Sequence, residues 1–244
     1  MANEILMAII QATTEFLPIS SSGHLALLGN LISEPNLFLI TILHFASLLA
    51  VLIFTRKEIS YLLKFNRESN RLLIYLIIAT IPAGIFGFIF KDMIEQSLGS
   101  YLFLGVSFLF TGTVLLLTKI PVKKSILNSK NALIIGAFQI LALFPGVSRS
   151  GMTISTALIL GIEKEKAAKF SFLLFIPLII GATILEIGEA YFSIELIIAF
   201  IICFVLSLAF LNLLLYILRK GSFWMFSIYC FIIGIISLLL HFTS

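Results

Sequence analysis

Residues 144–151 read Phe-Pro-Gly-Val-Ser-Arg-Ser-Gly and interrupt an apolar segment that runs from 132 to 161. Proline and glycine break a helix here. Each remaining arm is then shorter than the roughly 20 apolar residues needed to cross a bilayer. A guanidinium at membrane depth is costly, so Arg149 between two serines indicates a buried anion site. The stretch predicts a re-entrant hairpin with a polar tip.

A second interruption divides the apolar segment from 3 to 30. Residues 17–24 read Leu-Pro-Ile-Ser-Ser-Ser-Gly-His, and the same argument predicts a second re-entrant hairpin. For both segments, a single kinked span is the alternative. The apolar start of the chain lacks a basic leading region, so we expect it to belong to the fold and not to a cleaved leader.

Composition predicts one membrane domain over residues 1–244. Of the 244 residues, 60% are hydrophobic and 11% are charged, and the mean hydropathy is +1.17. Such a composition excludes a soluble domain. Cys203 and Cys230 lie in apolar runs without ligand spacing, so we expect them to be packing residues. The predicted fold is an all-α polytopic membrane protein with two re-entrant hairpins and six transmembrane helices, at roughly 37–55, 72–90, 101–120, 169–187, 193–218 and 222–242.

Positive charge is distributed unevenly over the predicted loops. If only the six runs cross, fourteen of the sixteen Lys and Arg residues fall on one side, Lys91 falls on the other, and Arg149 lies at a hairpin tip. The positive-inside rule places the fourteen in the cytoplasm. Both termini are then expected outside. Because orientation explains the net charge of +4, we expect no nucleic-acid partner.

The two halves of the chain, about 1–128 and 129–244, form a weak internal repeat. A shift of 128 residues aligns identical residues in both interruptions: Gln11 with Gln139, Phe16 with Phe144, Ser20 with Ser148, Ser22 with Ser150 and Gly23 with Gly151. Each half has one hairpin and three crossings, so the second half is predicted to be inverted, with the two tips meeting near the bilayer midplane. Gln139 is a candidate tether between the hairpins.

The first tip carries residues suited to a cation. Gln11 and Glu15 are four residues apart and share a helix face. A carboxylate and a carboxamide oxygen can hold a hard cation such as Mg²⁺, which completes its shell with waters and substrate phosphates. The alternative is a Glu15 carboxylate that is hydrogen-bonded to a broken helix end.

His24 follows the serine cluster Ser20, Ser21 and Ser22, where it could act as a nucleophile, general base or acid. The alternative is a packing histidine. His44 lies within a predicted span without a polar cluster beside it, and a structural and a functional role remain equally open. His241, near the last interface, is not expected to take part.

The second tip carries residues suited to an anion. Arg149 offers a planar fork that matches two phosphate oxygens. Ser148, Ser150 and Thr153 can add hydroxyl donors, and a helix that begins at this tip points its free N–H groups at the same anion. A purely structural pair between Arg149 and Glu15 is the alternative.

Both tips resemble the two signature motifs of the undecaprenyl-diphosphatase, or bacitracin-resistance protein, family. The resemblance lies in Gln-Ala-Thr-Thr-Glu-Phe-Leu-Pro-Ile-Ser-Ser-Ser-Gly-His at 11–24 and Pro-Gly-Val-Ser-Arg-Ser-Gly-Met-Thr at 145–153. Flanking residues at 167–174, Ala-Ala-Lys-Phe-Ser-Phe-Leu-Leu, extend it.

The resemblance implies hydrolysis of undecaprenyl diphosphate to the monophosphate carrier lipid and inorganic phosphate, with Mg²⁺ or Ca²⁺, at a site open to the periplasmic side of a bacterial inner membrane. It implies catalytic roles for Glu15, Ser21, His24 and Arg149, and cation binding at Gln11 and Glu15. The phosphate-binding residues that it implies are Ser148, Arg149 and Thr153, and we expect the neighbouring hydroxyls of Ser20, Ser22 and Ser150 to bind phosphate as well. The family commonly has Glu where this chain has Gln11, which removes one charge from the cation site.

Two other functional classes are compatible with the pattern. A transporter or flippase for an anionic or lipid-phosphate substrate would also use inverted repeats with broken helices. A non-catalytic scaffold fits poorly with so many polar residues at the tips. The sequence leaves open whether Ser21, His24 or water attacks, and whether the chain forms a homodimer.

Overall fold

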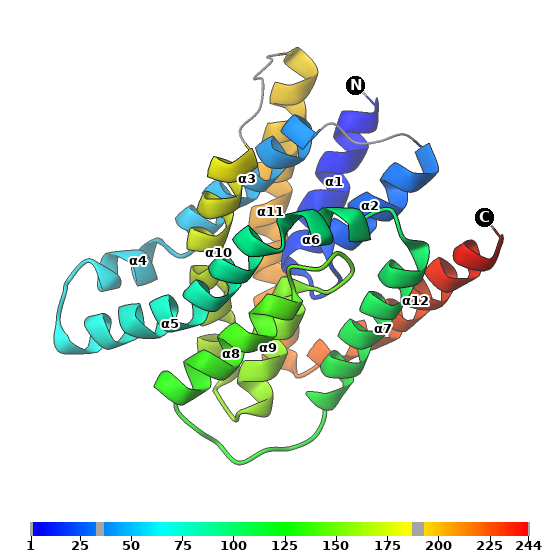
Figure 1. The fold of residues 1–244 in the computed structure, drawn as a ribbon. Helices are drawn as coiled ribbons and strands as arrows, with labels where there is room; N and C mark the ends of the chain where they lie inside the picture. The colour runs from blue at the N-terminus through cyan, green and yellow to red at the C-terminus, as the bar shows by residue number, and fades with distance from the viewer. Residues whose placement is uncertain (1, 33–36, 187–192, 244) are drawn as a thin grey trace.

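The computed structural model describes residues 2–32, 37–186 and 193–243, and this part of the chain contains helices and no strands (Figure 1). Residue 187, the predicted end of one span, lies outside it. The helices are α1 (Ala2–Phe16), α2 (Ser21–Ile32), α3 (Leu37–Phe54), α4 (Arg56–Leu62), α5 (Arg67–Ile89), α6 (Lys91–Ser97), α7 (Tyr101–Leu117), α8 (Ser129–Leu141), α9 (Arg149–Ile159), α10 (Lys164–Glu186), α11 (Ile194–Lys220) and α12 (Phe226–Thr243), with a 3-10 turn η1 (Phe223–Met225).

Both predicted helix interruptions are confirmed. One separates α1 from α2 at residues 17–20, and the other separates α8 from α9 at residues 142–148. Each contains a residue in the left-handed region, Ser20 with φ +68° and Gly146 with φ +89°. This backbone conformation redirects the chain at the break. The two arms of each interrupted segment pack against one another.

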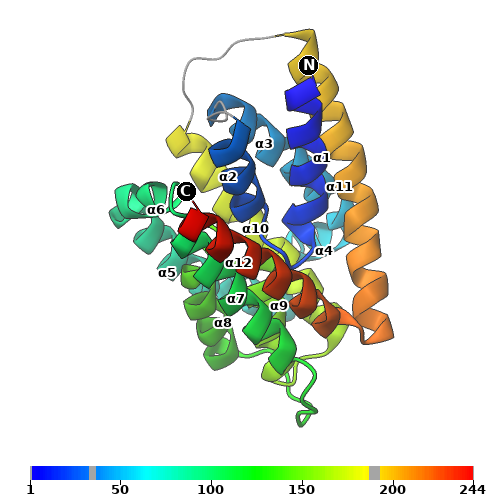
Figure 2. The same ribbon diagram turned by 90° about the vertical axis from the view of Figure 1, so that its right-hand side faces the viewer.

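The described helices include four to six candidate membrane spans. By length and composition α5, α10, α11 and η1 with α12 qualify alone. The count rises to six if two bent pairs are single spans: α3 with α4, bent by 71°, and α6 with α7, bent by 98°. The short helices α4 and α6 were not predicted. In Figure 2 the start of α1 lies at the upper end, and the loop between α7 and α8 lies at the lower end.

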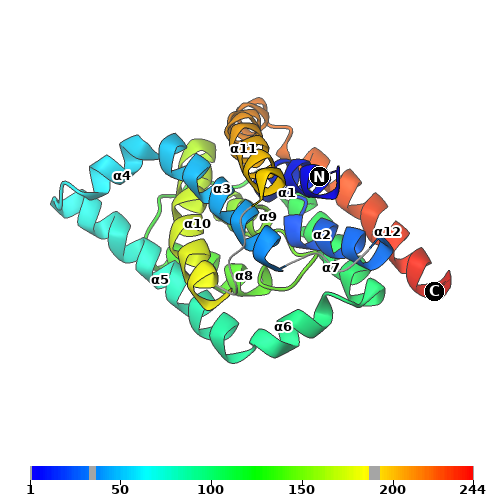
Figure 3. The ribbon, with the colours of Figure 1, turned by 90° about the horizontal axis from the view of Figure 1, so that it is seen from above.

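The helices of the two halves pack across one another. The first arm of each hairpin lies on the second long helix of the other half, so α1 packs on α11 and α8 packs on α5 (Figure 3). Helix α7 packs on α12, and α3 packs on α10. The Gln139 Nε2 donates to the Ala79 carbonyl of α5 at 3.3 Å, so this hydrogen bond does not join the two hairpins. It follows from the packing of α8 on α5, and a tether from Gln139 to the first hairpin stays a prediction.

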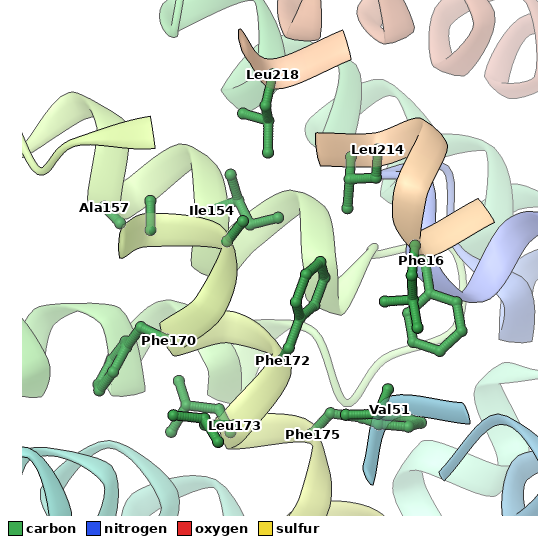
Figure 4. Packing of buried hydrophobic residues seen from close by; sticks show 14 of the residues in the cluster. Phe16, Val51, Ile154, Ala157, Phe170, Phe172, Leu173, Phe175, Leu214 and Leu218 are labelled. Atoms are coloured by element: carbon green, nitrogen blue, oxygen red, sulfur yellow. The ribbon is translucent and has the colours of Figure 1, made fainter. Parts of the chain in front are cut away.

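An aromatic cluster beside the hairpin tips forms part of the largest core (Figure 4). Phe16, at the end of α1, meets Phe172 and Phe175 of α10 edge to face, with ring centroids 6.4 and 5.7 Å apart. Such contacts hold rings in a fixed geometry. Since Phe16 follows Glu15 in sequence, this cluster fixes the base of the first tip.

We expect Gly23→Ala to lower the free energy of unfolding by about 1–3 kcal/mol, the usual cost of overpacking. A Cβ at Gly23 would lie 2.7 Å from the Gly146 Cα, where the two tips meet. Thermal unfolding in detergent measures the effect. Gly99→Ala is the control, because a Cβ at Gly99 meets nothing within 4 Å. Equal melting temperatures for the two variants would contradict the close approach.

Candidate active site

Two helices begin at the site with equivalent serine caps. The Ser20 Oγ accepts from the Gly23 N–H at 3.3 Å, and the Ser148 Oγ accepts from the Gly151 N–H at 3.1 Å. Each cap also lies near the serine two residues on: the Ser20 Oγ is 3.4 Å from the Ser22 Oγ, and the Ser148 Oγ is 3.2 Å from the Ser150 Oγ. These positions are 128 residues apart in sequence. The structure therefore repeats the same cap at both tips and directs two positive helix ends toward one region.

Backbone contacts hold the two tips together. The Ser150 Oγ donates to the Leu17 carbonyl at 3.2 Å. From α7, the Thr111 Oγ1 donates to the Gly146 carbonyl at 3.0 Å and accepts from the Ser148 N–H at 3.2 Å. Buried polar groups that are satisfied in this way fix the position of the tips.

A buried ion pair joins the two tips. The Arg149 Nη2 donates to the Glu15 Oε1 at 2.9 Å, and the two side chains are only 8% and 7% exposed. The guanidinium carbon lies 4.2 Å from the centroid of the Phe175 ring, and Nη1 donates to the Ser171 carbonyl at 3.4 Å. Arginine has five N–H donors, and these contacts use two. Donors therefore remain for a ligand.

The second oxygen of Glu15 is also surrounded by polar groups. The Ser21 Oγ donates to Oε2 at 2.6 Å and the Gln11 Nε2 donates to it at 2.9 Å. The His44 Nε2 lies 3.6 Å from the same oxygen. Since Nδ1 of His44 is 3.0 Å from the Ile40 carbonyl, which can only accept, we assign the Nδ1 proton to that bond. Glu15 is thus the centre of the polar cluster.

A cavity of about 220 Å³ opens between the tips. It brings together six of the predicted site residues with side chains from α3 and α10. Its polar lining consists of Glu15, Ser20, Ser21, Ser22, Thr41, His44, Ser148, Arg149 and Thr183. A volume of this size suits a small anionic head group.

Four predicted residues do not line the cavity. One is Gln11, which contacts Glu15, and the other three are His24, Thr153 and Ser150. The His24 Nδ1 lies 2.7 Å from the Ser20 carbonyl, and its Nε2 lies 2.8 Å from the Tyr229 hydroxyl. The Thr153 Oγ1 lies 2.6 Å from the Ser171 Oγ. Ser150 bridges the tips as described above. Direct contact of these three with phosphate stays a prediction.

His44 is the residue that the sequence left undecided, and the structure places it in the cavity. The sequence contains no polar cluster around it, because its polar neighbours come from α1 and α2. Ser171 and Thr183 of α10 were not predicted at all. Hydroxyl residues are common in apolar helices, so the sequence gives no reason to single out Ser171 and Thr183.

The residues at the first tip fit a divalent cation that also binds substrate. The Oε1 of Gln11 is buried and has no hydrogen-bond partner in the structure, although buried polar atoms normally have one. Among the described residues no group of three or more His, Cys, Asp or Glu side chains could hold a metal. Gln11 and Glu15 could therefore contribute two oxygen ligands, with phosphates and water as the others, as is usual for Mg²⁺.

Known proteins resemble this chain in sequence over almost their full length. A family model described as "Bacitracin resistance protein BacA" matches residues 4–236. A protein named undecaprenyl-diphosphatase from Thermosipho africanus is 42% identical, over 96% of this chain and 98% of that protein. Proteins of the same name from Thermotoga maritima and Methanococcus maripaludis strain C7 are each 39% identical, over 97% and 94% of this chain and 99% and 96% of theirs. The chain therefore belongs to the bacitracin resistance protein BacA family.

Proposed function

We propose that this chain is a membrane phosphatase that hydrolyses undecaprenyl diphosphate to undecaprenyl phosphate and inorganic phosphate. The observation that carries the proposal is the buried Glu15–Arg149 pair in a cavity between two capped helix N-termini. Such an arrangement binds phosphate groups and stabilises charge on them. The name of the relatives, undecaprenyl-diphosphatase, supports the same substrate.

The second tip holds the phosphoryl group that is transferred. Arg149 presents its guanidinium fork, and the N-terminus of α9 adds backbone donors beside the Ser148 cap. Phosphoryl transfer depends mainly on positioning and on stabilising charge at the phosphoryl oxygens. The bond between the terminal phosphorus and the bridging oxygen breaks, and its electron pair leaves with the lipid monophosphate.

The first tip provides the attacking group and the acceptor for its proton. The Ser21 hydroxyl already donates to the Glu15 carboxylate at 2.6 Å, so Glu15 can take the proton as the oxygen attacks. Water then attacks the phosphorus of phosphoryl-Ser21, the bond between phosphorus and Oγ breaks, and Glu15 returns the proton to Oγ, which releases inorganic phosphate. A water in the place of Ser21 could instead attack the diphosphate directly and use the same carboxylate. His24, the other predicted nucleophile, reaches this region through the Ser20 carbonyl. It is proposed here as a catalytic residue on the strength of the family motif.

A divalent cation on Gln11 and Glu15 would neutralise charge on the diphosphate when bound. Treatment with EDTA is expected to remove at least about 90% of phosphate release, with recovery on adding Mg²⁺ or Ca²⁺. Gln11→Glu is expected to lower the cation concentration that gives half-maximal rate, because a second carboxylate restores a charged ligand. Full activity in EDTA would remove the cation from the proposal.

The proposed topology has six transmembrane helices and two re-entrant hairpins in an inverted repeat of about 1–128 and 129–244. The reciprocal packing of α1 on α11 and α8 on α5, together with the repeated serine caps, supports it. The charge asymmetry of the loops supports an orientation with both termini and the active site facing outward. The proposed location is a bacterial inner membrane, as the family motifs imply.

A phosphate-release assay tests the function directly. The purified chain in detergent is expected to release inorganic phosphate from undecaprenyl diphosphate in the presence of Mg²⁺ or Ca²⁺. Absence of turnover with either ion would contradict the phosphatase proposal and favour the transporter that broken helices also suggest.

A further inference from the structure

A second cavity, a groove of about 280 Å³, lies between α5 and α10, and Lys91, Ile94 and Glu95 of α6 also line it. It shares three lining residues with the catalytic cavity: Leu143, Leu178 and Ala182. The two spaces therefore adjoin at these three residues. More than half of the residues that line the first are polar, whereas the second is lined mainly by apolar residues, with Thr80, Lys91 and Glu95 as its polar ones.

The walls of this groove are built from small residues at the surface of the two helices. Gly84 and Gly87 belong to α5, and Gly181 belongs to α10. A Cβ at Gly84 or Gly181 would meet no heavy atom within 4 Å. A glycine inside a helix costs about 0.5–1 kcal/mol relative to alanine. These glycines keep a space open at the lipid-facing surface.

Glycines elsewhere in the fold have a different explanation. A Cβ at Gly105 of α7 would lie 2.7 Å from Leu238, and one at Gly234 of α12 would lie 2.9 Å from Leu109. Those positions let two helices approach closely, as small residues do in membranes. Close packing does not account for Gly84 and Gly181.

We propose that this groove binds the first isoprene units of the prenyl chain while the diphosphate occupies the catalytic cavity. The inference rests on the proposed function and names the part of the site that holds the tail. An apolar cavity of about 150 Å³ holds one benzene-sized group. A groove of about 280 Å³ accordingly takes about two isoprene units, and the rest of the chain lies in the bilayer.

The groove positions the substrate and does not supply a hydrophobic driving force. Lipid tails are as apolar as the groove, so transfer of the prenyl chain between them gains little. The benefit is orientation, because a chain leaving through the groove directs the diphosphate toward Glu15 and Arg149. Misplacement by about 1 Å can lower a rate by about 100-fold.

The test fills the groove and compares two substrates of different tail length. Gly84→Leu and Gly181→Leu place a side chain in open space and favour the helix. Each is expected to lower kcat/KM for undecaprenyl diphosphate at least about tenfold. Each should leave kcat/KM for methyl diphosphate, which has no isoprene unit, within about twofold of the parent. Gly99→Leu, also in open space but outside both cavities, should change neither value.

Two results would overturn the inference. An equal loss on both substrates would mean that the substitutions damage the site and not the tail groove. Unchanged kcat/KM for undecaprenyl diphosphate would mean that the prenyl chain does not lie in the groove.

A binding measurement separates this inference from the proposed function. A farnesyl diphosphate carrying a diazirine on its second isoprene unit is expected to label peptides of α5 and α10 in the parent, and to lose that labelling in Gly84→Leu and Gly181→Leu. Labelling of α5 and α10 without phosphate release would support the groove as a prenyl site and contradict the proposed phosphatase activity. Phosphate release with labelling elsewhere would reject the groove alone.

Discussion

Arg149→Ala is expected to lower kcat/KM for phosphate release at least about 10³-fold, because removing an arginine that stabilises phosphoryl transfer commonly costs that much. Its fork lies 2.9 Å from Glu15 and retains free donors beside the cavity. Arg149→Lys keeps the charge but loses the fork, and we expect at least about a 10²-fold loss. Inorganic phosphate release in detergent measures both.

A single substitution in the buried Glu15–Arg149 pair also lowers stability. Removing one partner leaves the other charge uncompensated, which costs about 3–5 kcal/mol of unfolding free energy. Glu15→Ala carries the same penalty. The double variant Glu15→Ala/Arg149→Ala removes both charges, so we expect its melting temperature to exceed that of either single variant. We expect it to stay inactive. Recovery of activity together with stability would show that the pair is structural.

A matched control comes from an exposed ion pair. The Arg219 Nε lies 2.7 Å from the Glu165 Oε1, and the two side chains are 61% and 41% exposed. Exposed pairs contribute about 0–1 kcal/mol. Arg219→Ala is therefore expected to keep activity within about twofold and to melt near the parent. A large effect of this substitution would show that loss of positive charge, and not loss of the Arg149 fork, reduces the rate.

Much of the fold follows from hydropathy and from two interruptions. The apolar runs predicted α3, α5, α7, α10, α11 and α12, and the Pro and Gly residues predicted the two breaks. The short helices α4 and α6 were missed because a window of about 20 residues averages them into the neighbouring loops. Their bends of 71° and 98° relative to α3 and α7 depend on tertiary packing.

The internal repeat predicted that the two tips meet, but it did not predict which side chains face the cavity. The equivalence of Ser20 with Ser148 predicted two similar tips, and the structure shows the same cap in each. The sequence singled out His24 and left the role of His44 open, but in the structure His44, and not His24, lines the cavity. His24 turns toward Tyr229, whereas His44 approaches Glu15 from a different helix. Side-chain direction across helices is set by packing, which motif spacing does not record.

The tail groove could not be predicted from the sequence. Gly84 and Gly181 are separated by almost 100 residues, and glycine occurs 15 times in the chain. Only the packing of α5 beside α10 distinguishes them from the glycines at tight helix contacts. An open space between helices depends on how several helices pack together, which the sequence of each helix does not show.

Ser21→Ala is expected to lower kcat at least about 10³-fold, since loss of a nucleophile that acts with its base has effects of that size or larger. The Ser21 Oγ lines the cavity at the start of α2 and lies 2.6 Å from the Glu15 Oε2. Ser22→Ala is the control, because Ser22 lines the same cavity but its Oγ lies 3.4 Å from the Ser20 Oγ and not beside the Glu15 carboxylate. We expect less than a tenfold loss there. Acid quenching during turnover is expected to trap a phosphoryl group on Ser21. A Ser21→Ala variant that keeps a tenth of the parent rate would assign the attack to water or to His24, since neither needs this hydroxyl.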